Sequence, residues 1–220
     1  MVKINSEVNK IGNIVHDSVP VDNNEDNNEV VRTWGQIPDI KITDKRGGLN
    51  HHKVLESLGG YDPERGQKIA GHRGYFLKGY GVLLNSALVS YGMQFLMKRG
   101  YDIVQPPYFM KKEVMEETCQ LSDFEENLYR IEGGKEDKQG EDSGDAYLIA
   151  TSEQPISAMH RGEWLEEAQL PIRYGGISTC FRKEAGAHGK DNWGIFRIHQ
   201  FEKVEQFILS KPEDSWKIHE

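Results

Sequence analysis

The chain has 220 residues, of which 37% are hydrophobic and 28% charged, as is typical of a soluble globular protein with one good domain and a smaller segment. Its net charge of −8 excludes the strongly basic surface of a dedicated nucleic-acid-binding domain. A nucleic-acid partner would therefore have to bind a local basic patch. No apolar run approaches the ~20 residues of a membrane span. The N-terminus, MVKINSEVNK, also lacks an apolar signal core. The two cysteines, Cys119 and Cys180, have no metal-site or disulfide spacing and are interpreted as reduced thiols, so we expect a cytoplasmic protein with no membrane partner.

The first 60 residues contain little that predicts a core. Asp22 to Glu29 reads DNNEDNNE, which we interpret as a solvated loop rather than a metal site, because no glycine-kinked calcium loop surrounds it. Asn50 to Leu58 is predicted as a short helix with His51 and His52 near its start. Adjacent histidines on a helix diverge by about 100°, so they chelate poorly and are interpreted as surface side chains.

The clearest helix is predicted after a turn at Gly71 to Lys78. Apolar side chains recur there at the i, i+3, i+4 spacing of one helix face: Tyr80, Leu83, Leu84, Ala87, Leu88, Tyr91 and Phe95. Gly100 suits the C′ position that ends such a helix. Periodicity alone favours burial of this stripe in the core. A short strand is predicted at Tyr101 to Gln105, broken by Pro106-Pro107.

The next stretch is predicted as a helix from Lys111 to Leu128, followed by two strands at residues 128–131 and 147–150. A flexible, charged insertion, Gly133 to Gly144, joins these strands. After the second strand, a helix is predicted from Gln154 to Gly162 and continues helically through Trp164 to Ala168.

Thr151, Ser152 and Glu153 follow the second of these strands and have two interpretations. Two hydroxyls and a carboxylate at a strand end are equipped to bind a small amino compound. The same residues form an N-cap and capping box for the helix that follows, with Pro155 in its first turn. Without further context, the capping interpretation is favoured.

The stretch from Ser178 to Phe207 contains two strand-like runs that flank a glycine-rich loop, Ala185 to Gly194. Side chains alternate between faces along a strand, so Arg182 and Glu184 share one face of the first run. By the same parity, one face of the second run carries Arg197, Phe201 and Glu205. If the runs pair with these faces together, the surface suits a nucleotide and a small polar ligand. The alternative is an ordinary hairpin with a solvated, charged face.

The order of these elements predicts an α+β fold with an antiparallel sheet, because no βαβ unit repeats. The sequence contains neither a Walker loop nor the glycine fingerprint of dinucleotide-binding folds. A nucleotide would therefore bind by another geometry.

Three motifs in order carry a resemblance to a known family. The run FRKEAGAHGKDNWGIFRIHQFEKVEQF resembles motif 2 of the class II aminoacyl-tRNA synthetases, in the form found in seryl-tRNA synthetases of the eukaryotic cytosolic type. ATSEQP at 150–155 resembles the serine-binding Thr-x-Glu loop of that family, and residues 79–107 resemble its motif 1. The resemblance implies the antiparallel class II sheet flanked by helices, in partial form.

The resemblance also implies roles for individual residues. Arg182 matches the catalytic arginine that holds the ATP α-phosphate and the serine carboxylate. Glu184 matches the residue that contacts the adenine amino group. Phe201 matches the aromatic residue that stacks on adenine. Further ATP-binding residues implied in this way are Lys183, Ile198, His199 and Gln200. The serine-binding residues implied are Thr151, Ser152, Glu153, Arg182 and Glu205.

The implied activity is serine–tRNA ligation, in which ATP activates L-serine and tRNA(Ser) receives the seryl group. The implied cofactors are ATP and Mg2+, with no protein metal ligand expected within this chain. The family also implies a homodimer formed through motif 1. Asn192-Trp193 departs from the Thr-Arg usual in the motif 2 loop, which puts one contact to phosphate or to the tRNA acceptor end in doubt.

Two pieces of the family pattern do not match this sequence: the N-terminal coiled-coil arm and motif 3. We therefore expect a fragment, inactive or nearly so by itself. Residues 1–60 would link the missing arm to the catalytic domain, and 61–220 would form the N-terminal part of that domain. One alternative is a non-catalytic, synthetase-like ATP/serine-binding or interaction module. Another is a class II ligase for a different amino acid, against which Thr151-Ser152-Glu153 with Glu205 argues.

Overall fold

A computed structural model describes residues 8, 15–36, 50–119, 126–133, 144–184 and 194–220. Contacts divide the chain into two units, Met1–Leu49 and Asn50–Glu220, and each is described by itself. In the first unit, the short helix η1 (Glu25–Asn27) lies within the acidic stretch, and the side chain of Asn24 caps it by accepting from the Asp26 N–H. All other features below belong to the second unit.

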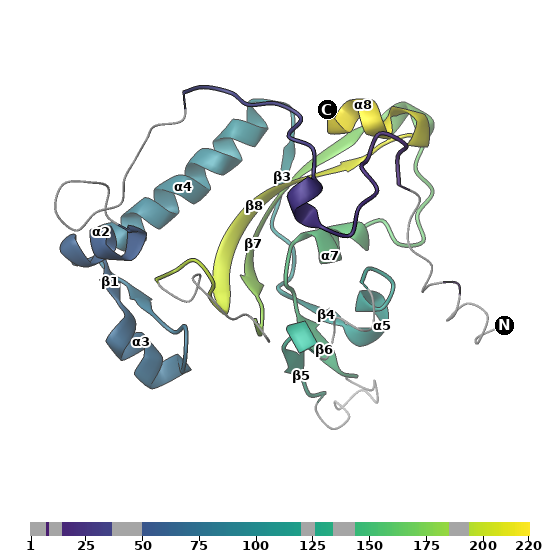
Figure 1. Cartoon of the computed structure of the whole chain (residues 1–220). Helices are drawn as coiled ribbons and strands as arrows, with labels where there is room; N and C mark the ends of the chain where they lie inside the picture. Colours follow the sequence, from purple (N-terminus) through teal and green to yellow (C-terminus); the bar gives the residue numbers. More distant parts are fainter. Residues whose placement is uncertain (1–7, 9–14, 37–49, 120–125, 134–143, 185–193) are drawn as a thin grey trace. The chain divides into compact units, whose positions relative to one another are not determined.

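A three-stranded sheet forms the centre of the second unit (Figure 1). Its order is β3 (Asp102–Val104), β7 (Ile172–Phe181) and β8 (Gln200–Leu209). The strands β7 and β8 pair antiparallel along their whole length, from Ile172↔Leu209 to Phe181↔Gln200, so the predicted hairpin is confirmed. The strand β3 pairs parallel to β7, so the predicted antiparallel sheet also contains one parallel pair. A parallel pair needs a long connection, and the chain between β3 and β7 supplies one.

The predicted long helix is α4 (Tyr80–Met97), which packs beside β8 (Figure 1). Gly92 permits the close approach, because a Cβ there would lie 3.3 Å from the Cβ of Val204. Gly100 ends the helix with a φ of 79°, and the N–H groups of Gly100 and Tyr101 donate to Met97 and Leu96, as in a Schellman motif.

The apolar stripe of α4 is exposed, so the prediction that it packs in the core is wrong for this chain. The helix turns its opposite side, with Gly92 and the buried Leu96, toward the sheet. The large side chains that remain 40% or more exposed on the stripe are Tyr80, Leu83, Leu84, Leu88, Tyr91 and Phe95. Periodicity identifies one face of a helix but not what covers that face.

A second sheet has the order β4 (Phe109–Lys111), β6 (Ala146–Leu148) and β5 (Arg130–Ile131), with both pairs antiparallel. Apolar side chains from this sheet, from α5 (Lys112–Met115) and from the residues that flank the strands build a core cluster: Met110, Met115, Leu128, Tyr147 and Ile149. The helix predicted from Lys111 to Leu128 is interrupted: α5 is followed by turns at residues 116–118, residues 120–125 lie outside the described part of the chain, and residues 126–127 are helical again. A continuous helix would carry Leu128 away from Met115, whereas the core brings both side chains into one cluster.

The segment before α4 forms α2 (His51–Ser57), β1 (Tyr61–Asp62), α3 (Pro63–Ala70) and β2 (Phe76–Leu77). The predicted short helix corresponds to α2, but α3 was not predicted. Its start has two sequence signals, Asp62, whose side chain accepts from the Arg65 N–H, and Pro63 at the first helical position. Strands β1 and β2 pair antiparallel and hold this segment together.

The helices after the second sheet are shorter than predicted. Instead of a helix from Gln154 to Gly162, α7 spans Glu153–Ser157, and the stretch from Trp164 to Ala168 contains only the start of η2 (Glu167–Gln169). The chain continues after β8 with η4 (Pro212–Asp214) and α8 (Ser215–His219). Within the described ranges, no helix is both long and apolar enough to cross a lipid bilayer.

Candidate active site

The two predicted faces of the β7–β8 hairpin meet on one surface. Directly opposite residues of an antiparallel pair project to the same side, and the register pairs Cys180 with Phe201 and Gly176 with Glu205. The Arg182 N–H donates to the His199 carbonyl at 2.9 Å, which continues the pairing beyond β7. The face predicted from parity is therefore a single surface, while most of the loop predicted at its end lies outside the described residues.

A cavity of about 310 Å³ opens on this surface at the loop end of the hairpin, and we call it the smaller cavity. Its lining comprises Arg182, Glu184, Ile195, Phe196, Arg197, Ile198 and Phe201. The guanidinium carbon of Arg182 lies 5.2 Å from the centre of the Phe201 ring, within cation–π range. An aromatic ring flanked by a cation and a carboxylate can hold a flat, polar ring together with a neighbouring anionic group.

One wall of the smaller cavity is braced from α2. The Ile195 N–H donates to His51 Nε2 at 3.1 Å, and the Phe196 ring centre lies 5.9 Å from that of His51. Burial, and then the neighbouring His52, lower the pKa of His51, which favours the neutral ring that can accept this bond. His51, interpreted from the sequence as a surface side chain, is half-buried and makes these contacts because the fold brings the start of α2 against the end of the hairpin loop.

At the other end of the same face, the carboxylate of Glu205 organises residues 151–153. Thr151 Oγ1 lies 2.8 and 3.1 Å from the two carboxylate oxygens, the Glu153 N–H donates at 2.9 Å, and Ser152 Oγ also donates. Lys203, two residues earlier on β8, places its Nζ 2.5 Å from Glu205 and 2.6 Å from Thr151 Oγ1. The sheet therefore fixes the conformation of this turn through one acidic side chain.

Two opposing influences set the pKa of Glu205. Burial alone raises it, but the hydrogen bonds from Lys203, Ser152 and Thr151 and the charge of Lys203 together outweigh burial, so the net pKa is lowered. The ionised form is thus favoured at neutral pH. Its hydrogen bonds are charge-assisted, which makes them stronger than bonds between neutral partners.

Ser152 does not act as the predicted side-chain cap. It lies at the N-cap position of α7, but its side chain makes no capping bond, and its fully buried hydroxyl donates to Glu205 instead. A capping hydroxyl accepts from a backbone N–H, whereas here the Ser152 hydroxyl donates to an ionised carboxylate, which gives a stronger, charge-assisted bond. Gly176, opposite Glu205, leaves space for this contact, since a Cβ there would collide with Ser152 and with Ile156.

Gln154 and Ala150 connect the turn to the hairpin and the core. Gln154 is buried; its Oε1 accepts from the Ala150 N–H at 2.9 Å and its Nε2 donates to Cys119 Sγ at the same distance. Arg182 Nε lies 3.4 Å from the Ala150 carbonyl. Residues 150–153 and Arg182 are therefore parts of one connected arrangement.

The remaining predicted site residues lie around this arrangement. Glu153 is exposed, and its carboxylate has no hydrogen-bond partner within the described part of the chain. The Lys183 N–H donates to the Asn127 carbonyl, and Ile198 is buried beside the smaller cavity. His199 and Gln200, by contrast, line a different cavity.

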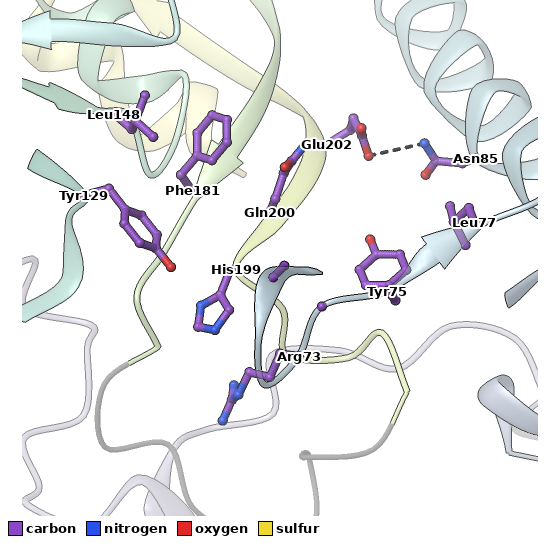
Figure 2. A pocket seen from close by; sticks show the side chains of 12 residues that line it. Arg73, Tyr75, Leu77, Asn85, Tyr129, Leu148, Phe181, His199, Gln200 and Glu202 are labelled. Carbon is purple, nitrogen blue, oxygen red and sulfur yellow. Dashed lines mark hydrogen bonds between the residues drawn. The ribbon is translucent and has the colours of Figure 1, made fainter. Parts of the chain in front are cut away.

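This larger cavity of about 420 Å³ is shown in Figure 2. Asn85 Nδ2 of α4 donates to Glu202 at 3.2 Å at one end of it, while Arg73 lies at the other end with His199 nearby (Figure 2). Burial, with the charge of Glu202 and the neighbouring Tyr61, raises the pKa of Tyr75 to about 12, so its hydroxyl stays protonated at neutral pH. Phe181, Gln200 and Glu202 belong to the side of the hairpin that alternates away from Phe201.

Sequence reasoning assigned no role to Lys203 or Arg73. The parity argument contained a signal for Lys203, because it lies two residues from Glu205 and so on the same face. No such signal exists for Arg73, which approaches Glu184 from a segment more than a hundred residues earlier in the chain. Among the described residues, no group of three or more His, Cys, Asp or Glu side chains gathers as a metal site would require.

Comparison with known proteins points to one family. The family described as the tRNA synthetase class II core domain (G, H, P, S and T) matches residues 129–220. The cytoplasmic serine–tRNA ligase of Schizosaccharomyces pombe is 56% identical over 212 residues, which cover 96% of this chain and 45% of that protein.

Two solved structures share the fold along 99% of this chain. The cytoplasmic serine–tRNA ligase of Naegleria fowleri, in complex with AMP, superposes with a TM-score of 0.88 at 47% identity. The seryl-tRNA synthetase of Pyrococcus horikoshii, complexed with ATP, superposes with a TM-score of 0.84 at 37% identity. This chain covers 49% and 50% of those two chains, respectively. The chain thus spans about half the length of the relatives it matches, and over that half it is similar to the cytoplasmic seryl-tRNA synthetases and to the class II core domain.

Proposed function

We propose that the protein to which this chain belongs is a serine–tRNA ligase, and that the hairpin surface holds serine and ATP in adjacent positions. The observation that carries the proposal is the network around Glu205, which presents Thr151, Ser152 and Glu153 next to Arg182. Polar groups held at fixed positions in a part-buried site suit a small hydroxy amino acid. Such a site disfavours alanine, because groups built for a hydroxyl would be left unpaired.

The proposed serine contacts divide by charge. The carboxylate of Glu153, which lacks a protein partner among the described residues, is available for the α-ammonium group of serine. Arg182 carries the opposite charge and takes the serine carboxylate. Its planar guanidinium can bind two oxygens at once, which suits a group that must contact a carboxylate and a phosphate together.

The proposed nucleotide contacts lie in the smaller cavity. Phe201 offers its ring to adenine, Glu184 accepts from the adenine amino group, and Ile198 lines the cavity beside them. Lys183, between Arg182 and Glu184 in the chain, is proposed as a further ATP contact. His199 and Gln200 line the larger cavity and not the smaller one, so we propose for them contacts at the edge of the nucleotide rather than beneath the base. The AMP and ATP complexes of the two similar structures support nucleotide binding by this fold.

The chemistry that follows from this arrangement needs no protein base. The serine carboxylate is already ionised at neutral pH. It attacks the α-phosphorus of ATP as the bond to pyrophosphate breaks, which gives seryl-adenylate; the 3′-terminal ribose of tRNA(Ser) then accepts the seryl group. The catalytic contribution of Arg182 is to position the two reactants and to stabilise the charge that develops on the α-phosphate.

Mg2+ is proposed only as a companion of ATP. The described residues supply no three-ligand cluster. Mg2+ is usually held mainly by nucleotide phosphates with one or two carboxylates, so the proposal requires no such cluster. When bound, it would supply positive charge at the phosphates.

We further propose a homodimer formed through α4 and a cytoplasmic location. The exposed apolar stripe of α4 supports the dimer, because single-sided apolar helices are normally covered. The names of the fungal and amoebal relatives, which are cytoplasmic enzymes, support the location. In this proposal, residues 1–60 link the catalytic domain to a separate tRNA-binding part, and 61–220 belong to the catalytic domain.

The test is ATP–pyrophosphate exchange by the full-length protein, measured with each of the standard amino acids. We expect exchange with serine and at least a hundredfold less with alanine, since unpaired polar groups give strong discrimination, on the order of 10⁴ at best. Exchange with threonine or proline but not serine would show a class II ligase of different specificity. Binding of ATP and serine without exchange would show a non-catalytic module.

A further inference from the structure

Arg73 contacts the proposed adenine-binding carboxylate from the turn that follows α3. Its Nη1 lies 4.0 Å from Glu184 Oε2 and 3.5 Å from the Arg197 carbonyl oxygen. Only 5% of the Arg73 side chain and 13% of the Glu184 side chain are exposed. A charge pair this far from water is screened weakly, so the position of one partner strongly affects the other.

The two oxygens of Glu184 are used differently. Arg73 and Arg197 both approach Oε2, at 4.0 and 3.2 Å. Within the described ranges, Oε1 makes no hydrogen bond. Because the same oxygen attracts both cations, the carboxylate is held in one orientation, and its second oxygen remains available on the wall of the smaller cavity.

The turn that carries Arg73 is tightly built. Gly66 of α3 lies against the backbone of Tyr75 so closely that a Cβ would collide with it, and a Cβ on Gly74 would come within 2.6 Å of the Gly66 carbonyl oxygen. Arg73 itself has a φ of 67° and Glu184 a φ of 50°, both in the left-handed region that costs energy for residues other than glycine. Strained backbone at both ends of one buried ion pair indicates that the surrounding structure enforces their meeting.

We propose that Arg73 is a positioning residue for nucleotide specificity, which orients Glu184 so that Oε1 accepts a hydrogen bond from the 6-amino group of adenine. This inference rests on the proposed function. An ionised carboxylate can only accept, so it matches the amino group of adenine and opposes the carbonyl oxygen that guanine carries at the same place. Arg73 touches neither base nor phosphate in this role and acts through Glu184.

Arg197 cannot replace Arg73 in this role. The Arg197 side chain is 47% exposed, and exposed ion pairs hold geometry poorly because water and salt compete with them. Arg73 is nearly buried and comes from a rigid turn. We therefore expect the orientation of Glu184 to depend mainly on Arg73.

The test compares two nucleotides in the full-length protein: ATP and purine riboside triphosphate, which lacks the 6-amino group. Equilibrium binding of each is measured by calorimetry, and serine-dependent exchange is measured in parallel. For Arg73→Met, we expect about a tenfold loss of affinity for ATP, the size of one charge-assisted hydrogen bond. We expect a loss below about twofold for purine riboside triphosphate, which cannot make this bond. The KM for serine should not change.

Three further variants make the result decisive. Lys68→Met, a surface substitution on α3, should leave both affinities unchanged. Glu184→Gln should lose the same preference for ATP, and adding Arg73→Met to it should have little further effect. Arg73→Lys keeps the charge but not the planar fork, so it should restore part of the preference and serves as the test if Arg73→Met does not fold.

Equal losses for the two nucleotides would overturn the inference, because a merely structural residue would weaken both alike. An unchanged preference in Arg73→Met would overturn it as well. These outcomes are distinct from failure of the proposed function, which would appear as wild-type protein without serine-dependent exchange, while the binding comparison still decides the role of Arg73.

Discussion

Glu184 and Glu205 lie on the same hairpin surface, yet their surroundings differ. Both oxygens of Glu205 already accept bonds from the protein, from Thr151, Ser152, the Glu153 N–H and Lys203. Glu184 is held through Oε2 alone, by Arg73 and Arg197. The saturated carboxylate is suited to shaping a site, whereas the half-used one is suited to contacting a ligand.

This difference assigns separate tasks to the two ends of the surface. At the Glu205 end, hydrogen bonds within the protein fix the conformation of the 151–153 turn, so a ligand that binds there contacts preorganised groups. At the Glu184 end, a ligand could enter a cavity of about 310 Å³ and donate a hydrogen bond to Glu184 Oε1. Arg182 lies between the two ends and contacts both, through the Ala150 carbonyl and the Phe201 ring.

The largest effect is expected from Arg182→Ala, because this residue joins the two ends. Loss of one electrostatic partner of the developing charge should lower the rate of serine-dependent exchange about a hundred- to a thousandfold. Thermal unfolding of the full-length protein should show that the fold survives. Arg173→Ala, on an exposed position of the same strand, is the matched control and should retain exchange. Unchanged exchange in Arg182→Ala would contradict its assigned role.

The next largest effect is expected from Glu205→Gln. This change leaves Lys203 without its charged partner and weakens the bonds from Thr151 and Ser152, so the free energy of unfolding should fall by about 1–3 kcal/mol. The KM for serine should rise, while the affinity for ATP changes little. Glu202→Gln removes an exposed carboxylate three residues earlier on β8 and should change stability much less. If both variants were equally stable, the shaping role of Glu205 would be refuted.

A smaller effect is expected from Phe201→Leu at the nucleotide end. Loss of the aromatic contact with a base and with Arg182 should cost about 0.5–1.5 kcal/mol, a several-fold rise in the KM for ATP. The KM for serine should stay constant, which separates this variant from Glu205→Gln. A rise in both constants would mean that the two ends of the surface are not independent.

The smallest effect is expected in the dependence of stability on pH, because burial and hydrogen bonding oppose each other at Glu205. The pKa of Glu205 in the folded protein lies below its pKa in the unfolded chain, which is about 4.3. The contribution of Glu205 to the free energy of unfolding is therefore fully present above about pH 4.3 and is lost as the pH falls through the pKa of the folded protein. The difference in unfolding free energy between wild type and Glu205→Gln should therefore be constant near neutral pH and shrink in acid. A difference that grew in acid would show that the pKa is raised.

Local sequence patterns predicted much of this fold. The helix α4 and its glycine end, the short helix α2 and the β7–β8 hairpin all follow from periodicity, turn chemistry and parity, which depend only on neighbouring residues. The same reasoning placed Arg182, Glu184, Phe201 and Glu205 on one surface. It overestimated the helices after Lys111 and Gln154, because there the core and the Glu205 network decide where each helix begins and ends.

The sequence by itself determined which side chains share a face and, through three ordered motifs, which family the chain resembles, since both are properties of local order along the chain. Only the tertiary structure decided that Ser152 bonds to Glu205 instead of capping a helix, that the stripe of α4 is exposed, and that β3 pairs parallel to β7. It also decided that Arg73 reaches Glu184. These outcomes depend on contacts between segments far apart in the chain. Burial strengthens the ion pairs and hydrogen bonds in these contacts, so they outweigh the local conformational preferences of the residues.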